Sequence, residues 1–198
     1  MSSPPVLRLL LIRHARAVNR TDLAGRLDVP AQPPHGPSLA HARQRLAALW
    51  PDPPRLVTSP ALRCRQTASA LLPGIPAHED ARLWEQYFGA WEGQATASLP
   101  DLGPLSRAAL AAYRPPGGEN FQDLASRATP ALREIATQGP AIIVTHAGVI
   151  RAALGLLGLG EAALGLAFEI APLSATLLTA SAGDAWAIGF VNLPLAPQ

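Results

Sequence analysis

The sequence contains no lysine, and all sixteen of its basic residues are arginines. This absence excludes Schiff-base chemistry and a Walker A nucleotide loop, because both need a lysine amine. The abundance of Ala, Arg, Gly and Pro indicates that compositional bias explains most of the absence of lysine. Arginine still supplies planar, permanently charged groups that suit phosphate or carboxylate. Because the arginines are spread along the chain, we expect no nucleic-acid partner.

Cysteine and long apolar runs are also scarce. Cys64 is the only cysteine, so an internal disulfide and a thiolate zinc cluster are both excluded. No uncharged, proline-free apolar stretch reaches the roughly 18 residues that a membrane span needs. Arg8 and Arg13 interrupt the apolar N-terminal segment, which therefore does not resemble a signal peptide. We expect a cytoplasmic protein with no membrane partner and no metal site.

Charged residues make up only 15% of the chain and apolar residues 48%. This balance is typical of a globular protein and not of a disordered one. A chain of 198 residues is long enough to bury a full core and fits one domain of ordinary size. No internal repeat and no long linker divides it. We therefore expect a single domain over residues 1–198.

Two apolar runs end abruptly in histidine. The run Leu9–Ile12 leads into Arg13 and His14, and the run Ala141–Thr145 leads into His146. Uninterrupted runs of this kind predict strands that are buried on both faces, as in a parallel sheet. Such strands deliver their last residues to the carboxyl edge, where open α/β folds bind ligands. One charged strand end would be an ordinary solvated cap, but two histidine-ended strands favour a site.

Two further residues join these candidates. Ser59-Pro60 predicts the start of a helix, with serine as the cap, and places Arg63 in the first turn, where unpaired N–H groups favour an anion. Glu85 lies in an aromatic segment that includes Trp84 and Phe88. Desolvation there favours the protonated form of a carboxyl and suits it to proton donation. By itself, Glu85 would otherwise be interpreted as a surface residue.

The order of predicted elements favours an α/β protein. Strands and helices alternate, which predicts a three-layer, open, mostly parallel sheet with helices on both faces. Residues 166–170, 175–180 and 185–191 are predicted to be short strands on the far side of that sheet. In this arrangement Arg13, His14, Arg63 and His146 all reach one edge. Two arginines and two histidines around one point indicate a phosphate site that needs no metal.

Four motifs in this order resemble the histidine phosphatase superfamily, which is phosphoglycerate mutase-like. They are Arg13-His14, the run from Ser59-Pro60 through Arg63-Cys64 to Thr67-Ala68, Glu85 before Tyr-Phe-Gly-Ala-Trp-Glu-Gly, and Thr145-His146-Ala147-Gly148. Within the superfamily, three segments look most like α-ribazole phosphatases, which act in cobalamin biosynthesis. Those segments are Gly25–Pro30, Phe88–Gly93 and Pro115–Glu119.

The resemblance implies a phosphohistidine mechanism. His14 would be the nucleophile, attacking as the neutral imidazole with its other ring nitrogen held by a backbone carbonyl. Arg13, Arg63 and His146 would hold the phosphoryl oxygens, and Asn19 would be a further phosphate ligand. Glu85 would protonate the leaving alcohol and then activate water. No cofactor is implied, and the partner would be a small phosphomonoester such as α-ribazole 5′-phosphate, bound by a monomer or homodimer.

The chain departs from the family pattern at three places. Ala15 stands where glycine usually follows the nucleophile, which is tolerable if φ there is negative. One residue fewer than usual precedes Asn19, and Asn120 replaces a serine. Two alternatives stay open at this point. A phosphoglycerate mutase would need more basic residues for a second phosphate. A phosphate-binding protein without turnover would fit the substitution at Ala15 and the shortened loop.

Overall fold

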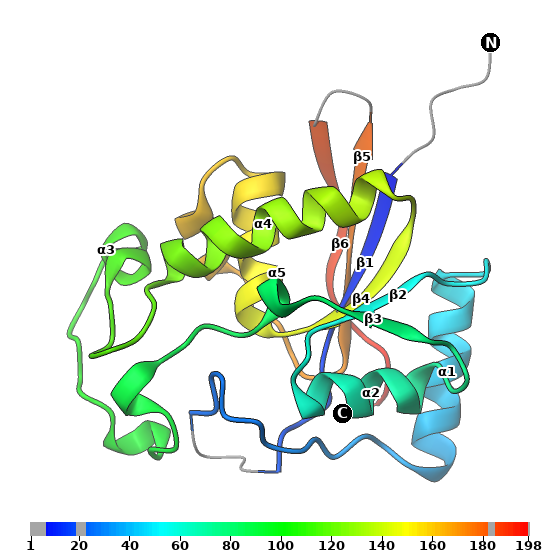
Figure 1. The fold of residues 1–198 in the computed structure, drawn as a ribbon, viewed down its shortest axis with the longest axis horizontal. Helices are drawn as coiled ribbons and strands as arrows, with labels where there is room; N and C mark the ends of the chain where they lie inside the picture. The colour runs from blue at the N-terminus through cyan, green and yellow to red at the C-terminus, as the bar shows by residue number, and fades with distance from the viewer. Residues whose placement is uncertain (1–6, 19–22, 182–184, 198) are drawn as a thin grey trace.

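A computed structural model describes residues 7–18, 23–181 and 185–197. Within these residues, one mixed sheet has the strand order β3-β2-β4-β1-β5-β6 (Figure 1). The inner pairs β3-β2, β2-β4 and β4-β1 are parallel, whereas β5 and β6 add antiparallel pairs at one edge. The strands are β1 (Leu7–Arg13), β2 (Leu56–Thr58), β3 (Ala77–Glu79), β4 (Ala141–Thr145), β5 (Ser174–Ser181) and β6 (Ala185–Pro194).

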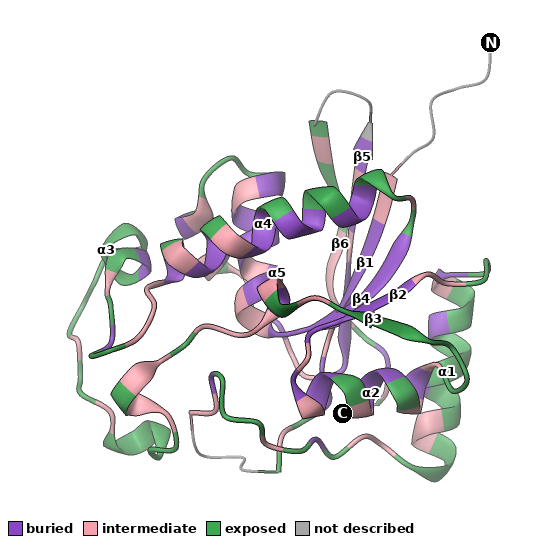
Figure 2. Cartoon of the chain, viewed as in Figure 1, coloured by how far each residue is buried: buried purple, intermediate pink, exposed green. Residues whose placement is uncertain are grey.

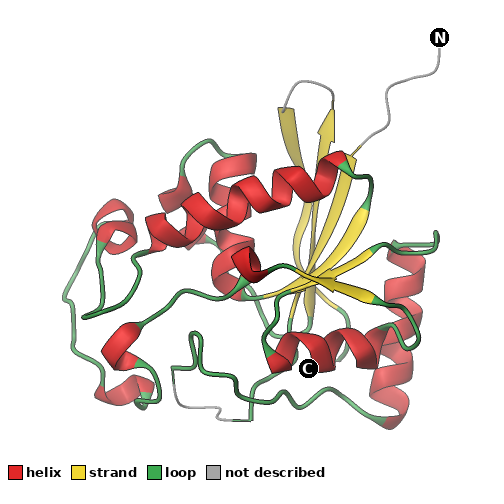
Figure 3. Cartoon of the chain, viewed as in Figure 1, coloured by secondary structure: helices red, strands yellow, loops and turns green. Residues whose placement is uncertain are grey.

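Helices cover both faces of this sheet, as the sequence predicts (Figure 3). The described α-helices are α1 (Gly36–Leu49), α2 (Leu62–Leu71), α3 (Arg107–Ala112), α4 (Phe121–Thr137) and α5 (Ala147–Ala153). A π-helical turn, Leu154–Gly158, continues α5. Short 3₁₀ turns occupy Ala81–Leu83, Gly89–Trp91, Thr96–Ser98 and Ala162–Ala167. The long connection from β3 to α4 therefore has little regular structure.

The strand β1 separates two cores. Leu9 and Leu11 pack into the cluster formed with α4 and α5, whereas Leu10 and Ile12 pack into the cluster formed with α1 and α2. Alternate side chains of a strand point to opposite faces, so all four residues of the run Leu9–Ile12 are buried (Figure 2). Burying each such side chain contributes about 1.5–3 kcal/mol. This double burial is why the run carries no polar interruption.

The register of β1 against β4 places the two histidines together. Arg13 pairs with Thr145, the last residue of β4, so His14 and His146 both follow at the same edge. The backbone N–H of His14 continues the ladder by donating to the carbonyl of Thr145 at 2.9 Å. The N–H of Ser59, which follows β2, donates to Val144 at 3.0 Å. Three parallel strands thus end at one point of the carboxyl edge.

The strands predicted at residues 175–180 and 185–191 are confirmed as β5 and β6. The prediction of a strand at residues 166–170 is wrong. Residues 162–167 form a 3₁₀ helix, and no strand occurs at residues 166–170. Packing on α5 decides this conformation. A Cβ added to Gly165 would lie 1.9 Å from the carbonyl oxygen of Arg151, so the two backbones touch there. Apolar composition alone does not distinguish such a segment from a strand.

Candidate active site

One ring nitrogen of His14 faces the cavity, and the other contacts the backbone carbonyl of the next residue, Ala15. Its Nδ1 lies 2.7 Å from the carbonyl oxygen of Ala15, and its Nε2 accepts a hydrogen bond from Nε of Arg63 at 3.3 Å. A guanidinium group has only donors, so the nitrogen that faces it carries the lone pair. Nδ1 therefore carries the hydrogen and donates it to Ala15. The predicted carbonyl contact is confirmed, and Nε2 is the ring nitrogen without a hydrogen.

Burial keeps this imidazole neutral. His14 is 7% exposed. Burial, followed by the charges of Arg63 and Arg13, lowers the pKa of His14 to about 3, although the hydrogen bond to Ala15 acts in the opposite direction. The ring therefore has an available lone pair at any pH near neutrality. Ala15 causes no conflict, because its φ is not positive and its N–H donates to Thr67 Oγ1 at 2.9 Å.

Arg63 is the central cation of the site. Its side chain is almost completely buried at the start of α2, where it donates to the carbonyls of Gly25 at 2.6 Å and Leu27 at 2.8 Å. These two carbonyls belong to the loop before α1. The same loop supplies Asp28, whose carboxylate accepts the N–H of Leu62 at 2.6 Å. The helix start and the arginine are thus both held by one distant segment.

The predicted capping role of Ser59 is wrong. The cap residue of α2 is Ala61, which makes no side-chain capping bond, and Asp28 supplies the acceptor from outside the helix. The hydroxyl of Ser59 lies 2.9 Å from Nε2 of His146, and it also accepts the N–H of Ala61, which precedes the helix, at 3.4 Å. A serine before proline fits both roles in the sequence, and only the packing of β4 against β2 distinguishes them.

His146 lies behind Arg63 and is fully buried. Its Nδ1 is 3.2 Å from Nη2 of Arg63, so this nitrogen is an acceptor, and Nε2 carries the hydrogen toward Ser59. The ring stacks on Trp84 at 6.3 Å between centroids and meets His14 edge-on at 5.1 Å. Burial first, and then the charge of Arg63, lower the pKa of His146 well below its ordinary value.

Arg13 completes the cationic wall. Its Nη1 donates to the carbonyl of Ile170, and burial, outweighing the opposing effect of Glu85, lowers the pKa of this guanidinium from its ordinary value. The backbone beside it is unusual. Leu173 has a φ of +56°, and its N–H reaches the carbonyls of Arg13 and His14 at 3.1 and 3.3 Å. Left-handed leucine is uncommon, and such strained positions cluster at functional sites.

Glu85 approaches the same point from the opposite side. Its carboxylate accepts the N–H of Gln86 at 3.0 Å and the N–H of Gly148, in α5, at 3.2 Å. Gly148 is needed for this approach, because a Cβ there would lie 2.1 Å from Oε1 of Glu85. The glycine after His146-Ala147 therefore makes room for the carboxylate. The sequence signal for Glu85 was its aromatic setting. Phe88 lines the same two cavities as Glu85, whereas the ring of Trp84 stacks on His146.

These side chains surround a cavity of about 380 Å³. Its wall carries Arg13, Arg63, the ring of His14 and the carboxylate of Glu85. The full lining is Arg13, His14, Arg16, Ala17, Leu23, Ala24, Gly25, Arg63, Glu85, Phe88 and Pro172. His146 does not line it. A second, largely apolar recess of about 230 Å³ lies on the other side of Glu85 and Phe88, which line both spaces.

The model of the histidine phosphatase superfamily (branch 1) matches residues 9–193. The chain belongs to the histidine phosphatase superfamily. It is 31% identical over 172 residues to a glucosyl-3-phosphoglycerate phosphatase from Mycolicibacterium vanbaalenii, covering 78% of this chain and 76% of the relative. The chain is therefore a phosphoric monoester hydrolase. The resemblance stated from the motifs is confirmed at the family level, whereas this relative does not bear the name of an α-ribazole phosphatase.

Solved structures share the whole fold. A mycobacterial glucosyl-3-phosphoglycerate phosphatase in complex with inorganic phosphate superimposes with a TM-score of 0.77 and 26% identity, covering 96% of this chain and 99% of the other. The Bacillus stearothermophilus protein YhfR has a TM-score of 0.77 at 22% identity, covering 94% and 96%, which supports the fold alone. The predicted mostly parallel α/β architecture of this superfamily is confirmed.

Some contacts that build the site of this histidine phosphatase cannot be predicted from its sequence. The carbonyls of Gly25 and Leu27 hold Arg63 through backbone atoms, which any residue would carry. Trp84 and Trp91 both lie in the aromatic segment that contains Glu85. Both are half-buried, Trp84 against His146 and Trp91 against Tyr113. Their aromatic surface is thus used inside the molecule.

Asn19, the remaining predicted phosphate ligand, lies outside the described residues. Among the residues that the structure does describe, no cluster of three or more His, Cys, Asp or Glu side chains could hold a metal ion. No described helix combines the length and apolar character that crossing a membrane requires.

The two neutral histidines predict acid sensitivity of the fold. Both have a pKa below 6.5 in the folded protein, so the unfolded chain binds more protons once the pH falls below that value. The contribution of these histidines to stability is therefore complete above pH 6.5. It is lost as the pH falls toward the folded-state pKa, which is about 3 for His14. The free energy of unfolding can be measured with urea at pH 7.5, 6 and 5. Below pH 6.5 its slope against pH should be steeper for wild type than for His14→Asn by about 1.4 kcal/mol per pH unit. Equal slopes would show that His14 is not held neutral.

Proposed function

We propose that the chain hydrolyses a small phosphomonoester without a metal ion, through a phosphohistidine at Nε2 of His14. The observation that carries this proposal is the orientation of the His14 ring. Its Nδ1–H is fixed on the carbonyl of Ala15, and the Nε2 lone pair faces Arg63 on the wall of the cavity. A neutral, oriented imidazole next to permanent cations is the arrangement that phosphoryl transfer needs.

The reaction has two balanced steps. In the first, Nε2 forms a bond to phosphorus while the bond from phosphorus to the substrate oxygen breaks, and Glu85 gives its proton to that oxygen. In the second, Glu85 takes a proton from water as the water oxygen attacks phosphorus and the bond to Nε2 breaks. Inorganic phosphate leaves, and both His14 and Glu85 return to their starting states. The alcohol and phosphate are the only products.

Arg13 and Arg63 stabilise the charge on the phosphoryl oxygens. The N–H that Arg63 directs at Nε2 of His14 becomes a donor to phosphoryl oxygen when the substrate is bound. His146 has a different starting state, since its Nδ1 accepts from Arg63. It can hold a phosphoryl oxygen only when this nitrogen carries a proton. Until then, His146 supports the position of Arg63 from behind.

The substrate that we propose carries a second anionic group. Arg16 lines the cavity beside His14 and is exposed, and its guanidinium makes no hydrogen bond or ion pair with another described residue. A carboxylate close to the phosphoryl group would satisfy it. The relatives named glucosyl-3-phosphoglycerate phosphatases act on a substrate with such a carboxylate, whereas α-ribazole 5′-phosphate has none. We therefore propose a phosphorylated acid of this kind before α-ribazole 5′-phosphate.

A substrate panel in the presence of EDTA tests this proposal. Phosphate release is measured from glucosyl-3-phosphoglycerate, 3-phosphoglycerate, α-ribazole 5′-phosphate and p-nitrophenyl phosphate. The phosphorylated acids should have the highest kcat/KM, and Arg16→Gln should raise their KM by about 10-fold, since a charge-assisted contact contributes about 1.5 kcal/mol. The KM for α-ribazole 5′-phosphate should not change.

Three outcomes would change the conclusion. A highest kcat/KM for α-ribazole 5′-phosphate would restore the substrate expected from the motif resemblance. Interconversion of 2- and 3-phosphoglycerate faster than their hydrolysis would establish a mutase. Phosphate binding without release from any monoester would establish a binding protein. Ala15 gives no support to that last alternative, because its backbone conformation suits alanine.

A further inference from the structure

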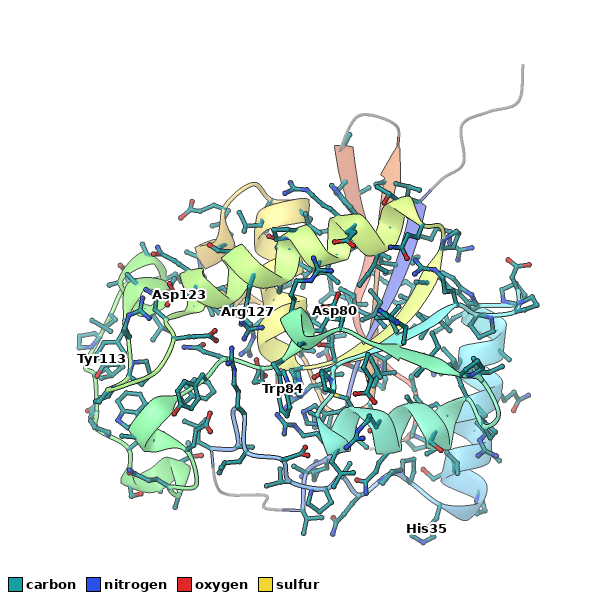
Figure 4. All side chains as sticks on the ribbon, in the orientation of Figure 1. His35, Asp80, Trp84, Tyr113, Asp123 and Arg127 are labelled. Atoms are coloured by element: carbon teal, nitrogen blue, oxygen red, sulfur yellow. The ribbon has the colours of Figure 1, made fainter. Side chains whose placement is uncertain are left out.

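Arg127 attaches helix α4 to the segment that carries Glu85. Its Nη1 donates to the carbonyls of Arg82 and Trp84, both at 2.8 Å, and its Nη2 donates to the carbonyl of Glu85 at 2.8 Å. Figure 4 labels Arg127 on α4 and Trp84 in the segment that it holds. One side chain therefore binds three backbone carbonyls within four positions of the chain.

The other donors of Arg127 go to Glu119. Nε reaches Oε1 and Nη2 reaches Oε2, both at 2.9 Å, in the two-pronged geometry that arginine forms with carboxylates. A guanidinium has five N–H groups, and these five hydrogen bonds use all of them. The side chain is only 20% exposed. Arg127 thus has no donor left for substrate or for solvent, and its entire capacity serves to hold this segment.

Glu119 extends the attachment to both sides. Its carboxylate also accepts the N–H of Tyr87 at 3.1 Å and a hydrogen bond from Arg26 at 2.7 Å. Burial raises the pKa of Glu119, but the hydrogen bonds from Arg127 and Tyr87 outweigh it and the pKa is lowered. The loop of Arg26 is the one whose Gly25 and Leu27 carbonyls hold Arg63. The segment that carries Glu85 and the loop that holds Arg63 therefore meet at the carboxylate of Glu119.

The segment needs such an attachment because it has little structure of its own. The 3₁₀ turn at Ala81–Leu83 ends just before Trp84, and the chain is irregular up to the turn at Gly89–Trp91. The carboxylate of Glu85 is itself held by two backbone N–H groups at 3.0 and 3.2 Å. Its place in the cavity thus depends on the path of the backbone, which Arg127 determines.

We infer that Arg127 is a positioning residue for proton transfer to the leaving group, acting through the backbone of Glu85. This inference rests on the proposed role of Glu85 as the acid. It sets Arg127 apart from the arginines that line the cavity, since Arg127 touches neither the phosphoryl group nor the leaving alcohol. Lysine cannot replace it, because an ammonium group has three donors and no fork.

Leaving-group dependence distinguishes positioning from general stability. We compare kcat/KM for p-nitrophenyl phosphate, whose leaving group needs no proton, with phenyl phosphate and an alkyl phosphate, whose leaving groups do. Arg127→Lys should lose roughly 10- to 10²-fold on the alkyl phosphate, because a displaced group costs this much. On p-nitrophenyl phosphate it should stay within about threefold of wild type. Glu119→Gln, which keeps the three carbonyl bonds, should show the same pattern in weaker form.

Two further variants make the result decisive. Arg43→Lys is the matched control, since Arg43 also donates to a carbonyl, that of Ala70 at 2.8 Å, but far from the cavity; it should show no leaving-group dependence. Glu85→Gln is the reference for loss of the acid. If Glu85→Gln is selective and both Arg127→Lys and Glu119→Gln slow all substrates equally or not at all, the inference is overturned and the proposed function stands. If Glu85→Gln is itself unselective, the proposed role of Glu85 fails and the inference fails with it.

Discussion

Replacing His14 by alanine is expected to lower kcat for p-nitrophenyl phosphate by at least about 10⁴-fold, because the proposed nucleophile is removed. The remaining cations would still bind phosphate, since Arg63 keeps its hydrogen bonds to the carbonyls of Gly25 and Leu27, and Arg13 keeps its bond to the carbonyl of Ile170. KM should therefore change less than kcat. The measurement is steady-state phosphate release with EDTA present, with the fold of the variant checked by urea unfolding.

Trapping of the intermediate separates the nucleophilic role from any other role of His14. Wild-type protein denatured in alkali during turnover should carry a phosphoryl group on a fraction of its molecules, and acid should then release it, as a phosphorus–nitrogen bond requires. His14→Ala should carry none. The control is His41→Ala, because His41 is exposed on α1 and its loss should leave both trapping and turnover unchanged. Equal turnover in wild type and His14→Ala would exclude the phosphohistidine pathway.

The architecture could be predicted because its central strands are buried on both faces. The runs Leu9–Ile12 in β1 and Ala141–Val144 in β4 contain no polar residue, and this pattern has few interpretations. The segment at residues 166–170 is also mostly apolar, but Leu166 and Ala167 end a 3₁₀ helix that packs on α5, and residues 168–170 form no strand. Its conformation depends on contact with a backbone that lies close only in the folded protein. Local composition carries no record of that contact.

The cations and histidines of the site were predictable for a related reason. Each of them follows a strand or opens a helix, so its position depends on short-range sequence and on the order of strands. Their partners were not predictable. The cap of α2 comes from Asp28, and the hydroxyl of Ser59 turns to His146. Asn120, whose effect the sequence left open, caps α4 by exchanging hydrogen bonds with Asp123.

The position of Glu85 was only partly predictable from the sequence. Its aromatic neighbours suggested partial burial, but an irregular segment has no pattern that places its carboxylate. Two distant residues do so: Gly148 leaves the space, and Arg127 holds the backbone. Neither is adjacent to Glu85 in the sequence. This is why the acid is the part of the site whose role most needs an experiment.

Glu85→Gln is expected to slow the alkyl phosphate by roughly 10²–10⁴-fold, the range for loss of a well-placed acid. Glutamine keeps the size of the side chain, and its carbonyl oxygen can still accept one of the two N–H groups that hold Glu85. The amide has no proton to give to an alkoxide. The p-nitrophenolate ion leaves without one, so the first step on p-nitrophenyl phosphate should be little affected.

The second step gives this variant a distinctive signature. In the proposed mechanism Glu85 also takes the proton from the attacking water, so in Glu85→Gln the phosphohistidine formed from p-nitrophenyl phosphate should be hydrolysed slowly. Rapid mixing should then show a burst of one equivalent of p-nitrophenolate followed by slow turnover. The trapped phosphoryl group should accumulate beyond its wild-type level. A variant that releases all its leaving groups at wild-type rates, with no burst, would show that another residue supplies the proton.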